Sequence, residues 1–187
     1  MGQHTDMGLL LAALGFAAER HRDQRRKGVE ASPYINHPIA VARLLHDVGG
    51  ITDTRVLAAA LLHDTVEDTE TSFDEIEAAF GPAVADTVRE VSDDQTLSRE
   101  ERKAEQVRHA PHLSPAARLV KLADKVANLG DVLSAPPAGW SARRKIEYFE
   151  WAKEVVDPLR GCNASLEARF DTLYAQRLAL AGERPSS

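Results

Sequence analysis

The chain has 187 residues, of which 43% are hydrophobic and 28% charged, and this balance is typical of one globular domain rather than of a disordered or membrane-bound chain. The formal net charge of −6 argues against a general nucleic-acid binder, because such proteins gain most of their affinity by neutralising phosphates. The single cysteine, Cys162, excludes an internal disulfide, so we expect a reducing, cytoplasmic location. The apolar run from Leu9 to Ala18 is too short to span a membrane and is interpreted as a buried helix.

Apolar residues recur at three- and four-residue spacing along the whole chain, whereas alternating β-branched runs are scarce, so the sequence predicts an all-α fold. No linker or repeat divides the chain, and we expect one domain over residues 1–187. The first helix is expected at about Thr5 to Gln24, the second from Pro38, with Asn36 or His37 as cap, to Gly49 and Gly50, and the third at about Thr52 to Val66. Two capping boxes, Ser72 with Glu75 and Ser98 with Glu101, predict the starts of further helices, and Gly81-Pro82 separates two of them. The last helices are expected from Pro115, from Ser141 to about Pro158, and up to about Leu180. Loops are predicted at 25–36 and 135–139, and the tail after Leu180 is expected to fray.

Four ionisable residues gather in the segment HDTVED, at His63, Asp64, Glu67 and Asp68. At about 100° per residue they fall within an arc of roughly 140° on one helix face, next to an apolar stripe. Burying such groups without a partner is costly, and the usual remedies are a bound cation or a hydrogen-bonded network. A His-Asp dipeptide alone is a weak signal, since a core histidine bonded to a neighbouring carbonyl has the same sequence.

Two further residues strengthen the interpretation as a metal site. His37 lies upstream at a helix start in PYINHP, and Asp124 lies downstream on a helix in KLADKVANL. Two imidazoles and two carboxylates suit a divalent ion such as manganese, iron or magnesium, with positions left for water and phosphate. We therefore predict a metal site formed by the order His, His-Asp, Asp.

The segments PYINHP, AALLHDTVEDT and LVKLADKVANL, together with RRKG and GWS...EYFEWA, resemble the HD hydrolase domain of the RelA/SpoT superfamily, and most closely its small stand-alone members of the Mesh1 type. The resemblance runs from about residue 8 to about residue 178. It implies one HD phosphohydrolase domain, all-helical with at most a short β-hairpin. It also implies an enzyme that uses manganese to remove pyrophosphate from the 3′ position of guanosine tetra- or pentaphosphate, giving GDP or GTP, and that carries no synthetase domain of its own.

Site residues follow from the same resemblance. The family's metal ligands match His37, His63, Asp64 and Asp124, which would hold one manganese ion per chain. The acidic pair that activates and orients the attacking water matches Glu67 and Asp68. The family's substrate contacts match Arg26, Lys27, Asn128, Arg144 and Tyr148. The i, i+4 spacing places Asn128 on the same helix side as Asp124, and Tyr148 on the same side as Arg144.

The sequence departs from the family pattern at three positions around the nucleotide. A lysine usual in the family is Gln95 here, with Arg99 nearby; an aromatic residue or histidine is Ala127, and an arginine is Gly130. These departures concern affinity and base selectivity and leave the metal ligands intact. Without the resemblance, the basic run 25–27 and the pair Lys121 and Lys125 would be interpreted as solvated helix faces or ends.

Three hypotheses for function remain. The first is the alarmone 3′-pyrophosphohydrolase, the second is the same chemistry on another phosphorylated nucleotide such as NADPH, and the third is a non-catalytic nucleotide-binding module. The presence of Glu67 and Asp68 disfavours the third, because a binding module has no need of a water-activating pair. The expected partner is a guanine nucleotide, with neither nucleic acid nor membrane, and a homo-oligomer is left open. His21 on the first helix has no assigned role.

Overall fold

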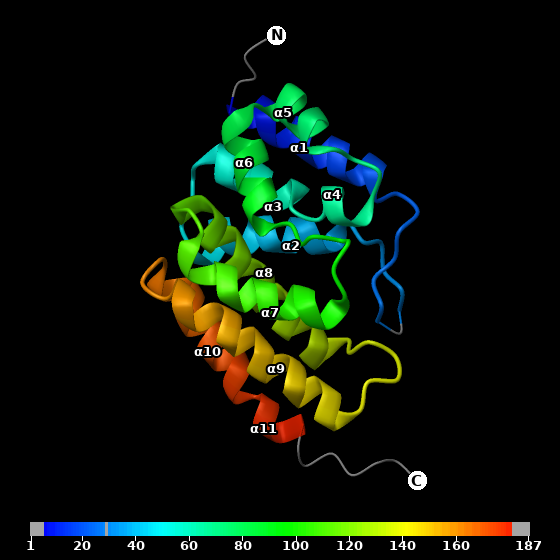
Figure 1. Cartoon of the computed structure of the whole chain (residues 1–187), viewed down its shortest axis with the longest axis vertical. Helices are drawn as coiled ribbons and strands as arrows, with labels where there is room; N and C mark the ends of the chain where they lie inside the picture. Colours follow the sequence, from blue (N-terminus) through cyan, green and yellow to red (C-terminus); the bar gives the residue numbers. More distant parts are fainter. Residues whose placement is uncertain (1–5, 29, 181–187) are drawn as a thin grey trace.

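The computed structural model describes residues 6–28 and 30–180, in which every regular element is a helix (Figure 1). In chain order these are α1 (Asp6–Arg20), α2 (Asn36–Arg43), the π-helix η1 (Leu44–Val48), α3 (Thr54–Leu62), α4 (Thr65–Asp68), α5 (Phe73–Phe80), α6 (Pro82–Val91), α7 (Arg99–His109), η2 (Ala110–His112), α8 (Pro115–Ser134), α9 (Ala142–Val156), η3 (Asp157–Leu159), α10 (Ala164–Ala175) and α11 (Arg177–Leu180). The predicted all-α fold is confirmed. Thr5 and the tail beyond Leu180 lie outside the described residues.

Two helices form the centre of the molecule. Every residue of α3 from Val56 to Leu62 is buried, and α8 is buried without interruption from Val120 to Ala127. A helix that is buried all round must be covered on every side, and α8 accordingly contacts α2, α3, α6, α9 and α10. In Figure 1, α9, α10 and α11 lie at the lower end, away from α1 and α5 at the top. None of the described helices is long and apolar enough to cross a membrane.

The predicted helix starts at the two capping boxes are confirmed. The side chain of Ser72 accepts a hydrogen bond from the backbone N–H of Glu75, and the Glu75 carboxylate accepts one from the N–H of Ser72. The same reciprocal pair joins Ser98 and Glu101 at the start of α7. Each pair satisfies backbone donors that the first helical turn leaves free.

The predicted continuous helix over HDTVED is wrong, because the chain breaks at His63 and Asp64. Helix α3 ends at Leu62, and the short α4 begins at Thr65. The Thr65 hydroxyl donates to the carbonyl of Leu62 at 2.6 Å, a carbonyl that a continuing helix would have used. Asp64, with φ −97° and ψ −5°, leaves ideal helical geometry. His63 and Asp64 therefore lie on a turn.

The helix that carries His37 begins earlier than predicted. Its first residue is Asn36, with Ile35 as the N-cap, so that Pro38 is the third helical residue rather than the first. A hydrogen-bonded turn precedes the helix, in which the N–H of His37 donates to the carbonyl of Tyr34 at 2.9 Å. Pro38 is tolerated because N–H groups in a first helical turn have no partner within the helix. Helix α1 is also shorter than expected and ends at Arg20.

Two loops that are far apart in sequence lie together beside the ends of α1 and α8. Isolated β-bridges join Arg25 to Pro33 and Gly28 to Pro137, which is consistent with the expectation of at most a short hairpin. The N–H of Ala138 donates to the carbonyl of Lys27 at 3.2 Å. A Cβ atom on Gly28 would lie 3.1 Å from the carbonyl oxygen of Ala135, so the close approach favours glycine there.

Candidate active site

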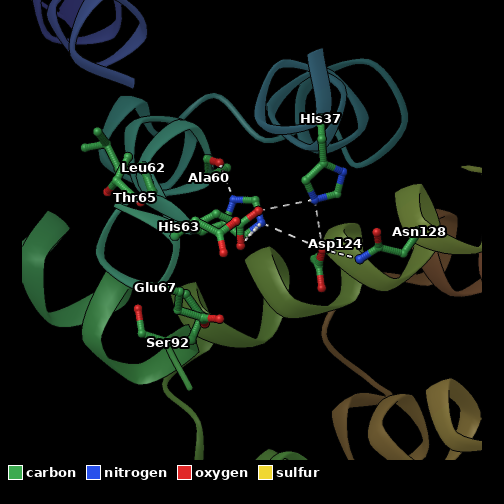
Figure 2. Close-up of polar contacts among 12 residues, drawn as sticks. His37, Ala60, Leu62, His63, Thr65, Glu67, Ser92, Asp124 and Asn128 are labelled. Carbon is green, nitrogen blue, oxygen red and sulfur yellow. Dashed lines mark hydrogen bonds and ion pairs between the residues drawn. The ribbon is translucent and has the colours of Figure 1, made fainter. Parts of the chain in front are cut away.

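Three of the four predicted metal ligands converge in the core. His37 comes from α2, His63 from the turn after α3, and Asp124 from the buried stretch of α8 (Figure 2). One ligand atom from each lies within 4.8 Å of the others, and all three residues are buried. The Asp124 Oδ1 atom lies 3.2 Å from Nε2 of His37 and 3.7 Å from Nε2 of His63. The group could hold a metal ion.

The hydrogen bonding of His63 fits a metal ligand. Its Nδ1 lies 2.8 Å from the carbonyl of Ala60, and a carbonyl can only accept, so Nδ1 carries the proton and Nε2 has a free lone pair. That Nε2 atom is buried and has no hydrogen-bond partner among the described residues. A histidine whose second nitrogen donates to a carbonyl is the usual arrangement behind a metal-bound imidazole. Without a metal, burial lowers the pKa of His63. The charges of Asp64 and Asp124 outweigh this effect of burial and raise the pKa to about 9.

Asp64, the fourth predicted ligand, lies at the edge of this group. Its carboxylate oxygens lie 3.2 Å from Nε2 of His63 and 3.7 Å from Nε2 of His37. The hydroxyl of Tyr34 donates to Oδ2 of Asp64 at 2.6 Å. Burial and the charges of Asp64 and Asp68 raise the pKa of Tyr34, so the phenol stays a donor. Tyr34 thus holds one carboxylate oxygen.

Two side chains of α8 donate hydrogen bonds to the carboxylate of Asp124. Lys125 Nζ donates to Oδ2 at 3.1 Å, and the Asn128 amide donates to Oδ1 at 2.6 Å. Burial alone would raise the pKa of Asp124, but Lys125 and the two histidines lower it well below its usual range. Lys125 is itself buried and lies 4.6 Å from the centre of the Trp151 ring. The interpretation of Lys121 and Lys125 as a solvated face is wrong, since both are buried in the core.

Glu67 is close to the metal group but is bonded to a different loop. Its Oε1 accepts a hydrogen bond of 2.7 Å from the backbone N–H of Asp93, and the Gln95 amide lies 3.4 Å from Oε2. Burial, followed by the negative charges of Asp64 and Asp93, raises the pKa of Glu67 to about 8. A carboxyl group with such a pKa is suited to taking up a proton near neutral pH.

The predicted acidic pair is divided between two cavities. Glu67 lines a cavity of about 110 Å³ together with the metal group and Lys121. Asp68 lines an adjoining cavity of about 380 Å³ and accepts a hydrogen bond of 2.9 Å from the amide of Gln24. Consecutive residues of a helix point about 100° apart, so Glu67 and Asp68 of α4 face different cavities.

The larger cavity collects most of the predicted substrate contacts. Arg26, Lys27, Asn128 and Tyr148 line it, and Arg26 and Asn128 also line the small cavity, so the two are contiguous. Arg144 does not line this cavity, but Trp140 does. The Arg144 guanidinium lies 4.7 Å from the centre of the Trp140 ring. Arg99, which stands near Gln95 in sequence, also lines the cavity.

Sequence reasoning missed three residues of the site: Tyr34, Asp131 and Trp140. Asp131 forms an ion pair with Arg26, and Trp140 packs on Tyr148 with ring centres 5.5 Å apart. Two signals could have found them. Tyr34 stands three residues before His37 in the same motif, and Asp131 is two helical turns after Asp124, on the same side of α8. The contacts of Trp140 depend on the fold and have no local signal.

Comparison with known proteins agrees with this geometry. The pattern of the HD domain family matches residues 13–171. The guanosine-3′,5′-bis(diphosphate) 3′-pyrophosphohydrolase MESH1 of Xenopus tropicalis is 58% identical over 170 residues, which cover 91% of this chain and 95% of that one. The human MESH1 is 58% identical over 173 residues, covering 92% and 97%. A solved structure of a metazoan orthologue of SpoT, described as hydrolysing ppGpp, superposes with a TM-score of 0.88 at 49% identity, covering 90% of this chain and 95% of that chain. This chain therefore belongs to the HD domain family and is a close homologue of MESH1.

Proposed function

We propose that this protein is a metal-dependent hydrolase of guanosine tetra- and pentaphosphate, which removes the 3′-pyrophosphate and leaves GDP or GTP. One observation carries the proposal. The unpartnered Nε2 of His63 faces two carboxylates in a small cavity that is contiguous with a larger one lined with arginine and lysine. A cation at the inner end and positive side chains along the wall suit a substrate with several phosphates. The names of the MESH1 relatives give the same activity.

His37, His63, Asp64 and Asp124 would hold one divalent ion, and manganese is the ion we expect. The donor set of two imidazoles and two carboxylates fits such an ion. When bound, the ion supplies Lewis-acid activation of a phosphate oxygen and of water. Tyr34, Lys125 and Asn128 would keep the carboxylates in place, since each already donates to one of them.

Glu67 would act as the general base. It would take a proton from water as the water oxygen forms a bond to the phosphorus atom attached to the 3′-oxygen. The bond between that phosphorus and the 3′-oxygen then breaks, and the 3′-oxygen leaves with the electron pair on the nucleotide. The position of Glu67 in the cavity of the metal group supports this role, as does its pKa of about 8. Asp68, at the wall of the adjoining cavity, would orient the water from the substrate side.

The nucleotide would occupy the larger cavity. Arg26 and Lys27 would bind phosphate oxygens, Asn128 and Tyr148 would contact the sugar and base, and Arg144 would close on the ligand from its position on Trp140. In this proposal Arg26 must exchange its ion pair with Asp131 for a phosphate. We further propose that residues 8–178 act as a single domain, because the ligands come from helices that pack in one core.

The test is a product assay on the purified, metal-stripped protein. Guanosine tetraphosphate is supplied with manganese, and GDP and pyrophosphate are measured by anion-exchange chromatography, with NADPH as a parallel substrate. We expect equimolar GDP and pyrophosphate, complete loss with chelator, and no turnover by His63→Ala, with His46→Ala as the matched control because His46 is exposed and remote from the metal group. Hydrolysis of NADPH alone would replace the alarmone with another nucleotide. Tight binding of either nucleotide without turnover would instead indicate a non-catalytic module.

A further inference from the structure

The chain just after α1 contains a buried histidine that the proposed reaction does not use. His21 is 1% exposed, and its ring packs on Tyr34 with ring centres 4.8 Å apart. Its Nε2 is buried without a hydrogen-bond partner among the described residues. Its Nδ1 lies 2.6 Å from Oε1 of Gln24. The one polar contact of this ring is therefore directed at Gln24.

That contact defines the direction of a short hydrogen-bonded chain. An amide oxygen only accepts, so the proton between the two residues belongs to Nδ1 of His21. With Oε1 committed to His21, the other end of the Gln24 amide faces Asp68, and Nε2 donates to Oδ2 at 2.9 Å. Reversing the amide would place its oxygen against the Asp68 carboxylate and its N–H against the Nδ1 proton. Asp68, which only accepts, and the Nδ1–H of His21 therefore favour the same orientation, in which Gln24 donates to Asp68.

The backbone of Gln24 is held as well. Its carbonyl accepts a hydrogen bond of 3.0 Å from the N–H of Tyr34, and its own N–H donates to the carbonyl of His21 at 3.0 Å. The same Tyr34 donates its hydroxyl to Asp64. Gln24 and Tyr34, which are joined by this backbone hydrogen bond, therefore each hold one carboxylate: Gln24 holds Asp68, and Tyr34 holds Asp64.

Asp68 needs such a partner more than the other carboxylates do. It is exposed and is the last residue of a four-residue helix, so packing does not restrict its rotamers. Asp68 and Gln24 both line the large cavity. A hydrogen bond from a held amide to an ionised carboxylate is charge-assisted and directional. It is suited to fixing the carboxylate toward the cavity.

We propose that His21 and Gln24 are positioning residues that hold the carboxylate of Asp68 in its reactive orientation, with His21 acting only through the amide of Gln24. The effect on turnover rests on the proposed function, whereas the hydrogen-bonded chain does not. Neither residue touches the metal group, and His21 lines neither cavity, whereas Gln24 lies in the wall of the large one. Loss of His21 should lower kcat and leave KM and manganese affinity unchanged, and loss of Gln24 should lower kcat without changing manganese affinity.

The kinetic test uses four variants. Gln24→Leu and His21→Phe each remove a donor at similar volume, and we expect kcat to fall by about 10-fold, the usual scale for a supporting partner. His21→Asn should restore most of the rate, because the asparagine N–H₂ takes the place of Nδ1–H. The double variant His21→Phe/Gln24→Leu should be no slower than Gln24→Leu, because the second change removes a residue with nothing left to orient. Gln176→Leu, at the exposed glutamine that follows α10, is the matched control.

A measurement without substrate separates the chain from the reaction. Nitrogen-15 NMR of the His21 ring reports which nitrogen carries the proton, and we expect Nδ1 in the parent and a shift toward Nε2 in Gln24→Leu. If the parent shows this tautomer but does not hydrolyse the alarmone, the proposed function is wrong, whereas the hydrogen bonds from His21 to Gln24 and from Gln24 to Asp68 are supported. A proton on Nε2 in the parent, parental kcat in Gln24→Leu, or multiplied losses in the double variant would each overturn the inference. Gln24 is only half-buried, so Gln24→Leu keeps the test open if His21→Phe does not fold.

Discussion

The hydroxyl of Tyr34 donates a hydrogen bond of 2.6 Å to Oδ2 of Asp64, while Oδ1 of the same carboxylate lies 3.2 Å from Nε2 of His63. The phenol thereby decides which carboxylate oxygen faces the imidazole. Tyr34→Phe removes only this donor, and we expect manganese affinity to fall by about 10-fold or more, as is usual when the partner of a metal ligand is lost. Calorimetric titration of the metal-stripped protein measures the change. Tyr174→Phe is the control, since its hydroxyl bonds Glu150 in another part of the molecule. Equal affinity in parent and Tyr34→Phe would show that Asp64 needs no such partner.

Metal binding should be measurable as folding stability. An ion that binds only the folded state raises the free energy of unfolding by about 2.7 kcal/mol at a hundredfold excess over Kd. We therefore expect manganese to raise the Tm of the parent and to leave that of His63→Ala unchanged, because the variant loses a buried ligand atom. Metal analysis should find one ion per parent chain. A full complement of metal in His63→Ala would remove the proposed site.

Glu67→Gln keeps the volume of the side chain and its ability to accept from Asp93, but it removes the base. We expect kcat to fall by about 10²-fold or more, with manganese and nucleotide still bound. Steady-state kinetics and calorimetry on the same preparation check both parts. Loss of manganese in this variant would make Glu67 a ligand. Parental turnover in both Glu67→Gln and Asp68→Asn would exclude water activation by either carboxylate.

The same substitution has a predicted effect on stability. The pKa of Glu67 is raised to about 8 in the folded, metal-free protein, above its ordinary value, so the folded state retains a proton that the unfolded state releases. Stability contributed by this group is therefore present at low pH and is lost as the pH rises toward 8. In chelator, we expect Glu67→Gln to be more stable than the parent at pH 8 and equal to it near pH 4. A difference in Tm that does not vary with pH would contradict this.

Two neighbouring arginines allow a matched test of nucleotide binding. Arg144 lies over Trp140 at the rim of the large cavity, whereas Arg143 is exposed and pairs with Glu147. We expect Arg144→Ala to lower kcat/KM for the alarmone by about 10-fold, the scale of one charge-assisted hydrogen bond, without changing manganese affinity. Arg143→Ala should behave as the parent. Equal kinetics in the two variants would mean that Arg144 makes no contact with the nucleotide.

What could be predicted from the sequence depended on the range of the signal. The helix starts at Ser72 and Ser98 are specified by residues within one turn, and these predictions are confirmed. The break at His63 could not be predicted, because it depends on side-chain bonds to helix carbonyls that a periodic pattern does not encode. The separation of Glu67 from Asp68 reflects the angle of about 100° between consecutive residues of a helix, and the cavity that each side chain lines depends on the packed fold.

Contacts between residues far apart in sequence also could not be predicted. The ion pair of Arg26 with Asp131, and the burial of Lys121, depend on how the loop after α1 meets α8. The basic character of these residues was visible in the sequence, but its meaning was not, because a lysine on a helix is solvated in most proteins and buried in this one.

The three converging predicted ligands belong to segments that meet only in the finished core: His37 and His63 lie within the first 63 residues of the chain, and Asp124 lies in the buried stretch of α8. No early helix pair can bind the ion with the full set. During refolding, each of the first helices can form from local contacts, whereas the full ligand set is complete only after α8 has packed against α2 and α3. The rate of metal uptake by a refolding chain therefore reports the packing of α8 against these helices, a step distinct from the return of helical content.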